Sequence, residues 1–418
     1  MNAPKLRFKG FNDEWKLTLL SNLMSFSNGI NADKDSYGHG RKFINVLDIL
    51  NNNSIKYDDI IGSVFVSQKV EQTNKVEYGD LLFLRSSETR DDIGKSSVYL
   101  DKNEFALYGG FVIRGKRQKE YNPYFLKLNL ESPGIRHQIS SKAGGSTRFN
   151  VSQSILSSVE VSLPSQMEQE KIADFICHLD KKMQLQKEKI ELLKEKKKGF
   201  IQKIFNQELR FKDENGKEYP EWQFKKLGEI GEFKTSSVDK VIKNSEEQVY
   251  LLNYMDVYNH KVVNINNYRT LTKNSASSQQ IVTNNLKKGD IIFTPSSETP
   301  EDIGHSIVIP TDLPNTVYSY HLIRFRPYKS AQLDIKYSHF FCNTDLVRKQ
   351  IIKHATGSTR FTVSKENFSN ILVPLPSKKE QQNIAEFLML LDKQIKNEKE
   401  RLTVLGVQKQ AFMRNMFI

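Results

Sequence analysis

The sequence predicts an α+β protein with two tandem, pseudo-symmetric mixed α/β modules, separated by a pair of long antiparallel coiled-coil helices. Three observations predict this fold. Blocks of sequence occur twice in the same order, short β-rich runs fill most of each copy, and each copy ends in a heptad pattern. The chain has 418 residues, of which 38% are hydrophobic and 10% aromatic. This composition is sufficient for packed cores and argues against disorder.

The duplication is visible in blocks that lie about 210 residues apart. SSETRDDIGKS at 86–96 recurs as SSETPEDIGHS at 296–306, and GSTRFNVS at 145–152 recurs as GSTRFTVS at 357–364. In the same order, GDLLF recurs as GDIIF, LPSQMEQEKIADF as LPSKKEQQNIAEF, and GFIQKIF as AFMRNMF. Because ordered matches at a nearly constant offset do not arise by chance, the chain is an internal duplication.

The sequence pattern of each copy changes once, from short β-rich runs to a helical heptad pattern, and this change sets the expected domain boundaries. Short runs such as FINVLDI and DLLFL, separated by Gly, Asn and Asp, predict strands, and Leu-Pro-Ser then ends the last strand. Ser165 with Glu168, and Ser377 with Glu380, resemble capping boxes that begin a helix. The predicted domains are a first module at 1–163, a central helix at 164–206, a second module at 207–375 and a C-terminal helix at 376–418.

The two predicted helices carry a hydrophobic seam over about five heptads, as in coiled coils. The seam of the first consists of Ile172, Ile176, Leu179, Met183, Ile190, Leu193, Phe200 and Ile204. The seam of the second consists of Ile384, Leu388, Leu391, Ile395, Leu402, Leu405, Phe412 and Met416. Gln186 and Glu398, and Lys197 and Lys409, are polar at matching places, where such residues fix register. An amphipathic helix packed on its own module is the alternative, which suits helices of this length poorly.

Two segments differ strongly between the copies although they occupy corresponding places. Residues 31–75 and 240–285 share almost no sequence, whereas the motifs after them are kept. Divergent loops on a shared scaffold are what two recognition modules for different targets require. Ordinary drift of surface loops after duplication is the alternative.

The charge is compatible with a polyanionic partner but does not by itself distinguish one. Lys and Arg number 62 against 49 Asp and Glu, which gives a formal net charge of +13. A general enrichment in lysine is the alternative. Two cysteines exclude a disulfide scaffold and a four-thiolate zinc site. The N-terminus lacks a signal pattern and no apolar run suits a membrane span, so we expect a soluble, cytoplasmic protein without a membrane partner.

With these features, the chain resembles the DNA-specificity (S) subunit of a type I restriction–modification system. The resemblance covers essentially the whole sequence. It is carried by the LRF…EW starts, the SSET..DIG and GSTRF segments, and LPS..EQ..IA.F before each helix. The residues of the two starts are Leu6, Arg7, Phe8 and Trp15, and Leu209, Arg210, Phe211 and Trp222. Each motif is weak alone, but their ordered duplication is specific.

The resemblance implies a division of labour. Each module would be a target-recognition domain that reads one half of a bipartite, asymmetric site in double-stranded DNA. The helices would set the spacer and dock two methyltransferase (M) subunits, which carry S-adenosylmethionine and methylate adenine. Restriction and motor (R) subunits would join them to cleave unmodified DNA. The specificity subunit itself would be non-catalytic and would hold no cofactor.

A direct search for catalytic motifs agrees with a non-catalytic chain. IGKS at 93–96 resembles the end of a phosphate-binding loop, but Thr89 stands where that loop needs glycine. Asn122-Pro123-Tyr124 resembles part of an amino-methyltransferase motif but lacks its second proline. The eight histidines show no zinc-ligand spacing, so we expect no metal site. Cys177 and Cys342 are interpreted as buried hydrophobic residues.

The candidate DNA-binding residues fall into two groups, of which the first is shared by the copies. Arg148 and Arg360 of GSTRF, with Lys142 and Lys353 nearby, suit phosphate contact, although the arginines could instead orient onto a carboxylate. The SSET hydroxyls suit framework or phosphate positioning, with a purely structural role as the alternative. They belong to Ser86, Ser87 and Thr89, and to Ser296, Ser297 and Thr299. Arg114 and Arg324 match across copies, which fits phosphate contact or a structural ion pair.

The second group differs between the copies, as base-reading residues should. We place Arg85 opposite Thr294, Arg90 opposite Pro300 and Lys95 opposite His305. An arginine that binds guanine through two hydrogen bonds discriminates by about 1–3 kcal/mol. The alternative for each is an exposed, solvated side chain.

Two rival functions remain open. One is a stand-alone DNA-binding protein that needs no methyltransferase, and the other is a coiled-coil scaffold whose modules bind protein. Apolar residues outside the seam, namely Leu185, Leu192, Phe175 and Phe387, favour additional partner helices.

Overall fold

The computed structural model describes residues 3–418, and its internal contacts divide the chain into two compact units. Unit 1 combines residues 1–188 with 400–418, and unit 2 consists of residues 189–399. Each unit therefore holds one module together with parts of both long helices. We call the residues before the first long helix module 1 and the residues between the two long helices module 2.

Module 1 is built around a mixed five-stranded sheet in the order β2-β10-β6-β8-β4. Its strands are β2 (Met24–Asn28), β4 (Ser54–Ile55), β6 (Leu81–Leu84), β8 (Ser96–Tyr99) and β10 (Val112–Arg117). The LLFL run of β6 is buried at every position because the strand is central and covered on both faces.

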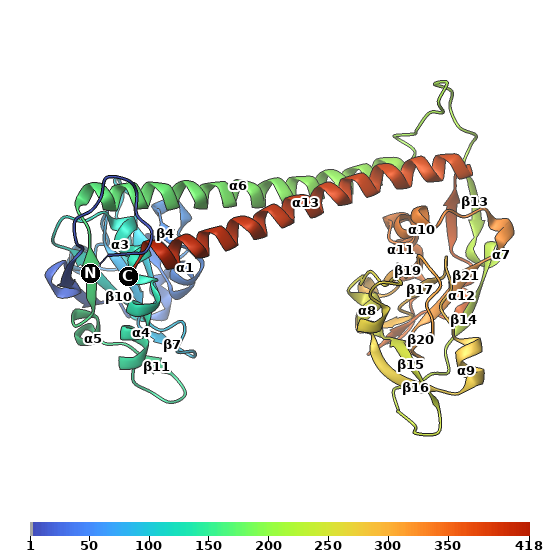
Figure 1. Ribbon diagram of the computed structural model, residues 1–418, viewed down its shortest axis with the longest axis horizontal. Helices are drawn as coiled ribbons and strands as arrows, with labels where there is room; N and C mark the ends of the chain where they lie inside the picture. Colours follow the sequence, from blue (N-terminus) through green and yellow to red (C-terminus); the bar gives the residue numbers. More distant parts are fainter. Residues whose placement is uncertain (1–2) are drawn as a thin grey trace. The chain divides into compact units, whose positions relative to one another are not determined.

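Smaller sheets and helices complete module 1. The sheets are β5-β3-β9, β1-β12 and β7-β11. Their strands are β1 (Lys16–Leu19), β3 (Tyr37–Ile44), β5 (Ser63–Val64), β7 (Ser86–Ser87), β9 (Leu107–Tyr108), β11 (Phe149–Asn150) and β12 (Glu160–Leu163). The helices are α1 (Val46–Asn51), α2 (Gln68–Thr73), α3 (Pro123–Leu130), α4 (Pro133–Lys142) and α5 (Gln153–Ser157). In Figure 1, β7 and β11 lie on the side of module 1 away from the long helix that follows it.

Module 2 repeats this architecture. Its sheets are β14-β21-β17-β19, β16-β15-β20, β13-β23 and β18-β22. The strands are β13 (Gln223–Lys226), β14 (Gly231–Thr235), β15 (Glu247–Leu252), β16 (Thr272–Ala276), β17 (Ile291–Phe293), β18 (Ser296–Ser297), β19 (Ser306–Val308), β20 (Thr316–Tyr318), β21 (Ile323–Pro327), β22 (Phe361–Thr362) and β23 (Leu372–Leu375). The helices are α7 (Leu227–Ile230), α8 (Tyr254–Tyr258), α9 (Ser278–Thr283), α10 (Ile335–Phe341), α11 (Asp345–Lys353) and α12 (Lys365–Ser369).

The divergent segments have the same element order despite their different sequences. In module 1 the order is β3-α1-β5-α2, with β4 added, and in module 2 it is β15-α8-β16-α9. Strand β3 pairs in parallel with β9, and β15 pairs in parallel with β20. The duplication therefore extends through the regions where the sequence shows no repeat.

The structure corrects one pairing between the copies. Leu84 and Thr294 donate their backbone N–H groups to the equivalent carbonyls of Lys95 and His305. Arg85 instead matches Pro295, because the carbonyls of both accept from the valine that follows the GSTRF loop. Placing Arg85 opposite Thr294 was therefore wrong by one residue.

The core of each module lies between its central sheet and the helices that follow it. The core of module 1 includes Phe83, Ile113, Leu126, Ile139 and Leu156. The core of module 2 includes Phe293, Phe325, Phe341, Ile351 and Phe368. The glycine of each DIG motif is needed for this packing. Gly94 and Gly304 have φ of +65° and +78°, and a Cβ there would meet a core isoleucine at 2.4 and 2.7 Å.

The Asn-Pro-Tyr triplet has a structural explanation. Asn122 is the N-cap of α3, and its side-chain oxygen accepts a hydrogen bond of 3.0 Å from the backbone N–H of Phe125. Pro123 occupies the first helical turn, where its missing N–H costs nothing. The triplet thus begins a helix.

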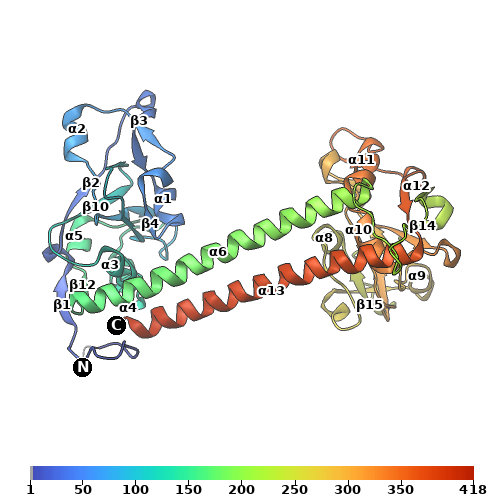
Figure 2. The ribbon, with the colours of Figure 1, turned by 90° about the horizontal axis from the view of Figure 1, so that it is seen from above.

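The long helices are α6 (Gln166–Phe205) and α13 (Lys378–Met416), and they pair inside each unit (Figures 1 and 2). In unit 1, Phe175 stacks edge-on against Phe412 at 4.9 Å between centroids. In unit 2, Phe200 meets Phe387 in the same way at 5.0 Å, and Lys197 Nζ lies 2.6 Å from a carboxylate oxygen of Asp392. Later residues of α6 contact earlier residues of α13, so the helices are antiparallel, which confirms the predicted fold class.

Every predicted seam residue is buried or half-buried. The charged seam residues form ion pairs between the helices. Glu398 accepts a hydrogen bond of 2.8 Å from Lys189 in unit 2, and Lys409 contacts Asp180 in unit 1. These pairs favour the observed register over a shifted one. Among the described residues, no helix is long and apolar enough to cross a membrane.

Each predicted capping box forms one of its two hydrogen bonds, the one accepted by the serine. Ser165 and Ser377 accept hydrogen bonds from the backbone N–H groups of Glu168 and Glu380, at 3.4 and 3.3 Å. The two buried carboxylates do not turn back to the cap, however. They bind the arginines of the LRF motifs in bidentate ion pairs. Arg7 reaches Glu168 at 2.9 and 2.6 Å, and Arg210 reaches Glu380 at 3.2 and 3.0 Å.

Candidate nucleic-acid interface

The SSET and GSTRF motifs lie side by side in each module as a two-stranded sheet. In module 1, Ser87 pairs with Phe149, and in module 2, Ser297 pairs with Phe361. The two motifs that are kept most closely between the copies therefore form one substructure. This explains why both are retained, since a change in either strand alters the other.

The GSTRF segment is a tight loop that displays its arginine. The backbone groups of Gly144 and Asn150 exchange two hydrogen bonds of 3.1 and 2.8 Å across it. Gly145 has φ of +113°, and a Cβ there would lie 2.0 Å from the carbonyl oxygen of Arg148, so only glycine closes the loop. Arg148 and Arg360 are exposed. Among the described residues neither contacts a carboxylate, and Arg360 donates to the Ser296 hydroxyl at 3.3 Å.

The SSET..DIG segment holds a carboxylate in each copy. Thr89 donates to Asp92 at 2.7 Å, and Lys95 lies 2.5 Å from the other oxygen of that carboxylate. These contacts, with the Lys95 hydrogen bond as the largest contribution, lower the pKa of Asp92. The Thr89 hydroxyl therefore stabilises the turn. Glu88 and Thr89 are exposed beside Arg148 along a cavity of about 360 Å³.

In module 2 the carboxylate that is equivalent to Asp92 is bound by different side chains. Asp302 accepts from the Tyr258 hydroxyl at 2.9 Å and lies 3.3 Å from Nε2 of His305. His305 in turn lies 3.2 Å from His260, nitrogen to nitrogen. The Tyr258 hydrogen bond contributes most to the lowered pKa of Asp302. Burial lowers the pKa of His305 despite this neighbouring acid.

Several predicted DNA contacts are structural groups instead. Arg114 and Arg324 are only 6% and 2% exposed. Arg114 donates to the carbonyl oxygens of Lys75 and Thr73, and Arg324 to that of Asn285 at 2.7 Å. Each guanidinium also lies over a tyrosine ring. Arg114 thereby ties strand β10 to the end of α2 and the loop after it, and Arg324 ties strand β21 to the loop after α9. Their partners are carbonyl oxygens, not the acids of an ion pair.

Other candidates are also buried, mainly in module 2. Thr294 is fully buried, and its hydroxyl accepts a hydrogen bond of 3.0 Å from the backbone N–H of His305. Ser296 and Ser297 are 9% and 5% exposed, whereas Ser86 and Ser87 are half-buried. Thr299 is exposed.

The lysine candidates differ in their surroundings. Lys142 is exposed at the end of α4, and its Nζ lies 3.0 Å from the hydroxyl of Ser158. Lys353 is exposed at the end of α11. The structural partner of Lys142 is His354, because Gly144 and Thr356 occupy equivalent places in the following loop. Lysine is thus not a shared feature of this position.

The candidates that remain on the surface of module 1 are Arg85 and Arg90, together with Arg148, Lys95 and Lys142. Arg90 lies over the ring of Phe149 at 4.7 Å and donates to the carbonyl of Ser140. Arg85 is half-buried and donates to the carbonyl of Gly110 at 3.1 Å. These arginines flank the β7-β11 sheet.

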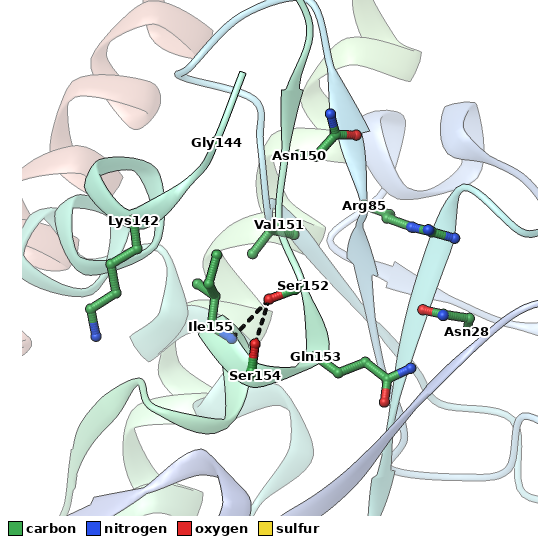
Figure 3. Close-up of a pocket in the computed structure, with 10 residues that line it drawn as sticks. All are labelled: Asn28, Arg85, Lys142, Gly144, Asn150, Val151, Ser152, Gln153, Ser154 and Ile155. Atoms are coloured by element: carbon green, nitrogen blue, oxygen red, sulfur yellow. Dashed lines mark hydrogen bonds between the residues drawn. The ribbon is translucent and has the colours of Figure 1, made fainter. Parts of the chain in front are cut away.

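Arg85 borders an open cavity of about 640 Å³, and most of the residues that line this cavity are of polar type (Figure 3). The cavity is lined by Asn28 at the end of β2, by Lys142, by Asn150 of β11 and by the first turn of α5. In Figure 3 the Arg85 guanidinium and the Asn28 amide lie on one side, and Ser152, Gln153 and Ser154 on another. The motif search missed the amide residues. Only Gln153 had a signal in the sequence, namely a difference directly beside a kept motif, since Gln153 follows NVS where lysine follows TVS.

Among residues 3–418, no cluster of three His, Cys, Asp or Glu side chains is arranged to hold a metal ion. Cys342 is buried as expected, and burial raises the pKa of its thiol. Cys177 is exposed on α6, which contradicts the buried position expected for it.

These features define a class of protein: two α/β modules of one topology, each followed by a long helix, with surface chemistry that differs between the modules. The family model of the type I restriction modification DNA specificity domain matches residues 16–195 and again residues 219–406. The chain therefore belongs to this family, and the two matches confirm the resemblance found in the sequence.

Similar proteins agree with this assignment. The type I restriction enzyme MjaVIII specificity subunit of Methanocaldococcus jannaschii is 24% identical over 367 residues, which cover 80% of this chain and 79% of the relative. The putative MjaX specificity subunit of the same organism is 26% identical over 249 residues, and the match spans 56% of each protein.

Solved structures share the fold. The S subunit of a type I restriction-modification system from M. genitalium aligns with a TM-score of 0.53 at 17% identity, over 100% of this chain and 99% of that one. A chain from a structural study of complex assembly and conformational transition of the type I R-M system aligns with a TM-score of 0.60 at 14% identity, covering 97% and 98%.

Proposed function

We propose that the chain is the sequence-specific DNA-binding subunit of a type I restriction–modification complex, in which each module reads one half of a bipartite, asymmetric site. One observation carries this proposal. Both modules keep the same backbone frame, including the β7-β11 and β18-β22 sheets, while the polar side chains around that frame differ. Family membership supports the same function.

The kept arginines would supply binding that does not depend on sequence. Arg148 and Arg360 are exposed on equivalent rigid loops, where a guanidinium can bind DNA phosphate. The net charge of +13 acts in the same direction. Affinity for any duplex should therefore fall steeply with salt, because phosphate neutralisation releases counterions.

The long helices would set the spacer and dock two methyltransferase subunits. Leu185, Leu192, Leu390 and Val404 are each more than half exposed, at 55–65%. They occupy the same heptad position of α6 and α13, outside the seam. Exposed apolar residues in register are typical of a helix face that a partner covers. Phe175 and Phe387, which we expected in this role, pack instead inside their own units.

The chemistry would belong to the partners. The methyltransferase subunits would bind S-adenosylmethionine and methylate adenine, and restriction and motor subunits would complete the complex. The chain itself would be non-catalytic, and its part would be to position these subunits on one DNA site inside the cell. The rival function is a stand-alone DNA-binding protein, which the purified chain would reveal by binding specific duplexes without a methyltransferase.

A matched deletion tests the spacer role. Removing residues 183–189 from α6 and 399–405 from α13 deletes one heptad from each helix and leaves the seam in phase. Seven residues shorten a helix by about 10 Å at 1.5 Å per residue. The methylated motif should then lose about three base pairs from its spacer, at 3.4 Å per base pair.

The readout is the map of methylated adenines in cells that express the chain with its methyltransferase subunits. Both half-sites should stay unchanged, because the modules are intact. Deletion from α6 alone is the control, and it should abolish methylation by leaving the helices unequal. An unchanged spacer in the matched deletion would disprove the ruler role.

A further inference from the structure

We propose that the cavity beside Arg85 is the base-reading pocket of module 1, and that Arg85 selects a guanine in the half-site of that module. The inference rests on the proposed function and assigns it to particular residues. The pocket residues that would face DNA are Asn28, Arg85, Lys142, Asn150, Gln153 and Ser154.

The backbone frame of the cavity is shared by the two modules, whereas most of the side chains that line it are not. Val151 and Ser152 have identical counterparts in Val363 and Ser364, and both serines cap the helix that follows, at 3.2 and 3.1 Å. The six residues named above as facing DNA, in contrast, all differ from their structural counterparts. The counterparts are Thr235, Pro295, His354, Thr362, Lys365 and Glu366. A site that is rigid in both modules and chemically different in each is what the reading of two unlike half-sites requires.

Arg85 is held in place by both its main chain and its side chain. Its backbone N–H donates to Phe111 at 2.9 Å and its carbonyl accepts from Val151 at 3.0 Å, which fixes the main chain on both sides. One terminal nitrogen donates to the carbonyl of Gly110 at 3.1 Å, which orients the guanidinium. Its other nitrogens bind nothing within residues 3–418. A guanidinium held in this way can offer two parallel donors to O6 and N7 of guanine.

Further hydrogen-bonding groups line the cavity beside Arg85. The Asn28 and Gln153 amides line the same cavity, and each combines donors with an acceptor, as adenine recognition in the major groove requires. Ser152 and Ser154 are linked by a hydrogen bond of 2.7 Å, which fixes the first turn of α5 (Figure 3). Lys142 adds a cation that suits an adjacent phosphate.

The test measures discrimination rather than activity alone. The wild-type chain, in complex with its methyltransferase subunits, is first used to map the methylated motif. Binding of the complex is then measured against the cognate duplex and a set in which each base pair of both half-sites is replaced singly. The variants are Arg85→Ala and Gln153→Lys, the second of which installs the residue of module 2. Lys119→Ala is the control, because it removes an exposed charge beyond the opposite end of β10.

The expected result is a local loss of specificity. Arg85→Ala should reduce discrimination at one guanine position by roughly 5- to 150-fold. Gln153→Lys should change the preference at a neighbouring position. The other half-site should keep its full discrimination in both variants, which also shows that the chain is folded. Lys119→Ala should leave every position unchanged.

Three outcomes would overturn the proposal. One is a uniform loss of affinity for all duplexes with a reduced salt dependence, which would make Arg85 a phosphate contact. Another is wild-type discrimination at every position in both variants. The third is failure of Arg85→Ala to fold while Gln153→Lys leaves every preference unchanged, which would make the cavity structural. A wild-type complex without a split motif would instead refute the proposed function itself.

Discussion

The two modules place a buried aspartate at the same point of their central sheet but neutralise it differently. Asp290, before β17, is fully buried and forms a bidentate ion pair with Arg326 at 2.6 and 2.7 Å. Asp80, before β6, is 2% exposed, and within residues 3–418 its carboxylate accepts hydrogen bonds only from backbone N–H groups, at 2.9 and 3.1 Å. The residue of module 1 that matches Arg326 is Lys116, which reaches Glu77 instead.

The difference has an electrostatic consequence. Burial is the main reason that the pKa of Asp80 is raised to about 6. In module 2 the guanidinium of Arg326 supplies the opposite charge. The comparison shows that the duplicated backbone is maintained by hydrogen bonds to main-chain groups, while the side chains that balance buried charge have diverged. The same separation of frame and side chains underlies the proposed reading of two half-sites.

The largest expected effect is removal of the Arg326 partner. Arg326→Ala leaves the Asp290 carboxylate buried without its counter-charge, which should destabilise module 2 by about 3 kcal/mol. Lys116→Ala is the matched control, and it should change the stability of module 1 by less than about 0.5 kcal/mol, since its ion pair is exposed. Hydrogen exchange followed by mass spectrometry reports the modules separately. Equal effects in both modules would contradict the comparison.

The next effect is an opposite response of the modules to pH. The folded-state pKa of Asp80 lies above the unfolded value of 3.8, so its contribution to stability is lost as pH rises through about 6 and returns on acidification. In module 2, burial lowers the pKa of His305, His321 and His339 below 6.5. Their contribution is complete above pH 6.5 and is lost as pH falls.

Between pH 7.5 and 5.5, module 1 should therefore gain protection from hydrogen exchange relative to module 2. Asp80→Asn, which removes the titrating group, should reduce the gain in module 1 and leave module 2 unaffected. A parallel response of both modules, in the wild type and the variant, would show that these groups do not govern the pH dependence.

The smallest expected effect is a gain in the stability of module 1 rather than a loss. Lys116→Arg places in module 1 the residue that holds Asp290 in module 2, at the equivalent position of β10. A new ion pair with Asp80 should stabilise module 1 by about 1 kcal/mol and weaken its pH dependence, because the folded-state pKa of Asp80 would fall. The measurement is again hydrogen exchange at pH 7.5 and 5.5. No gain, with an unchanged pH response, would mean that the two sheets differ in more than this side chain.

The large features of the fold could be predicted from the sequence because they repeat. The duplicated motifs predicted the two modules, and the heptad spacing predicted the seam residues of the long helices. Ile176 and Leu388, for example, are completely buried. The common elements of 31–75 and 240–285 could not be predicted. Their equivalence depends on parallel pairing with distant strands, and such pairing leaves no local sequence pattern.

The candidate site could be predicted only in part. Arg114 and Arg324 were assigned a DNA role because they match between the two copies. A buried arginine that donates hydrogen bonds to backbone carbonyls matches between the copies just as a DNA-binding arginine would, so sequence alone does not separate the two roles. Asn28 could not be found, because it reaches the pocket from a strand that is far from Gln153 in sequence. Arg85 was selected correctly as a residue that differs between the copies, although its counterpart was misassigned.

The central claim is that two modules of one fold read two different half-sites. Its most direct test is the map of methylated adenines in a host without its own adenine methylation that expresses this chain with its methyltransferase subunits. The account predicts one split motif with two unlike halves and a spacer of fixed length. Methylation confined to a contiguous palindrome would contradict it.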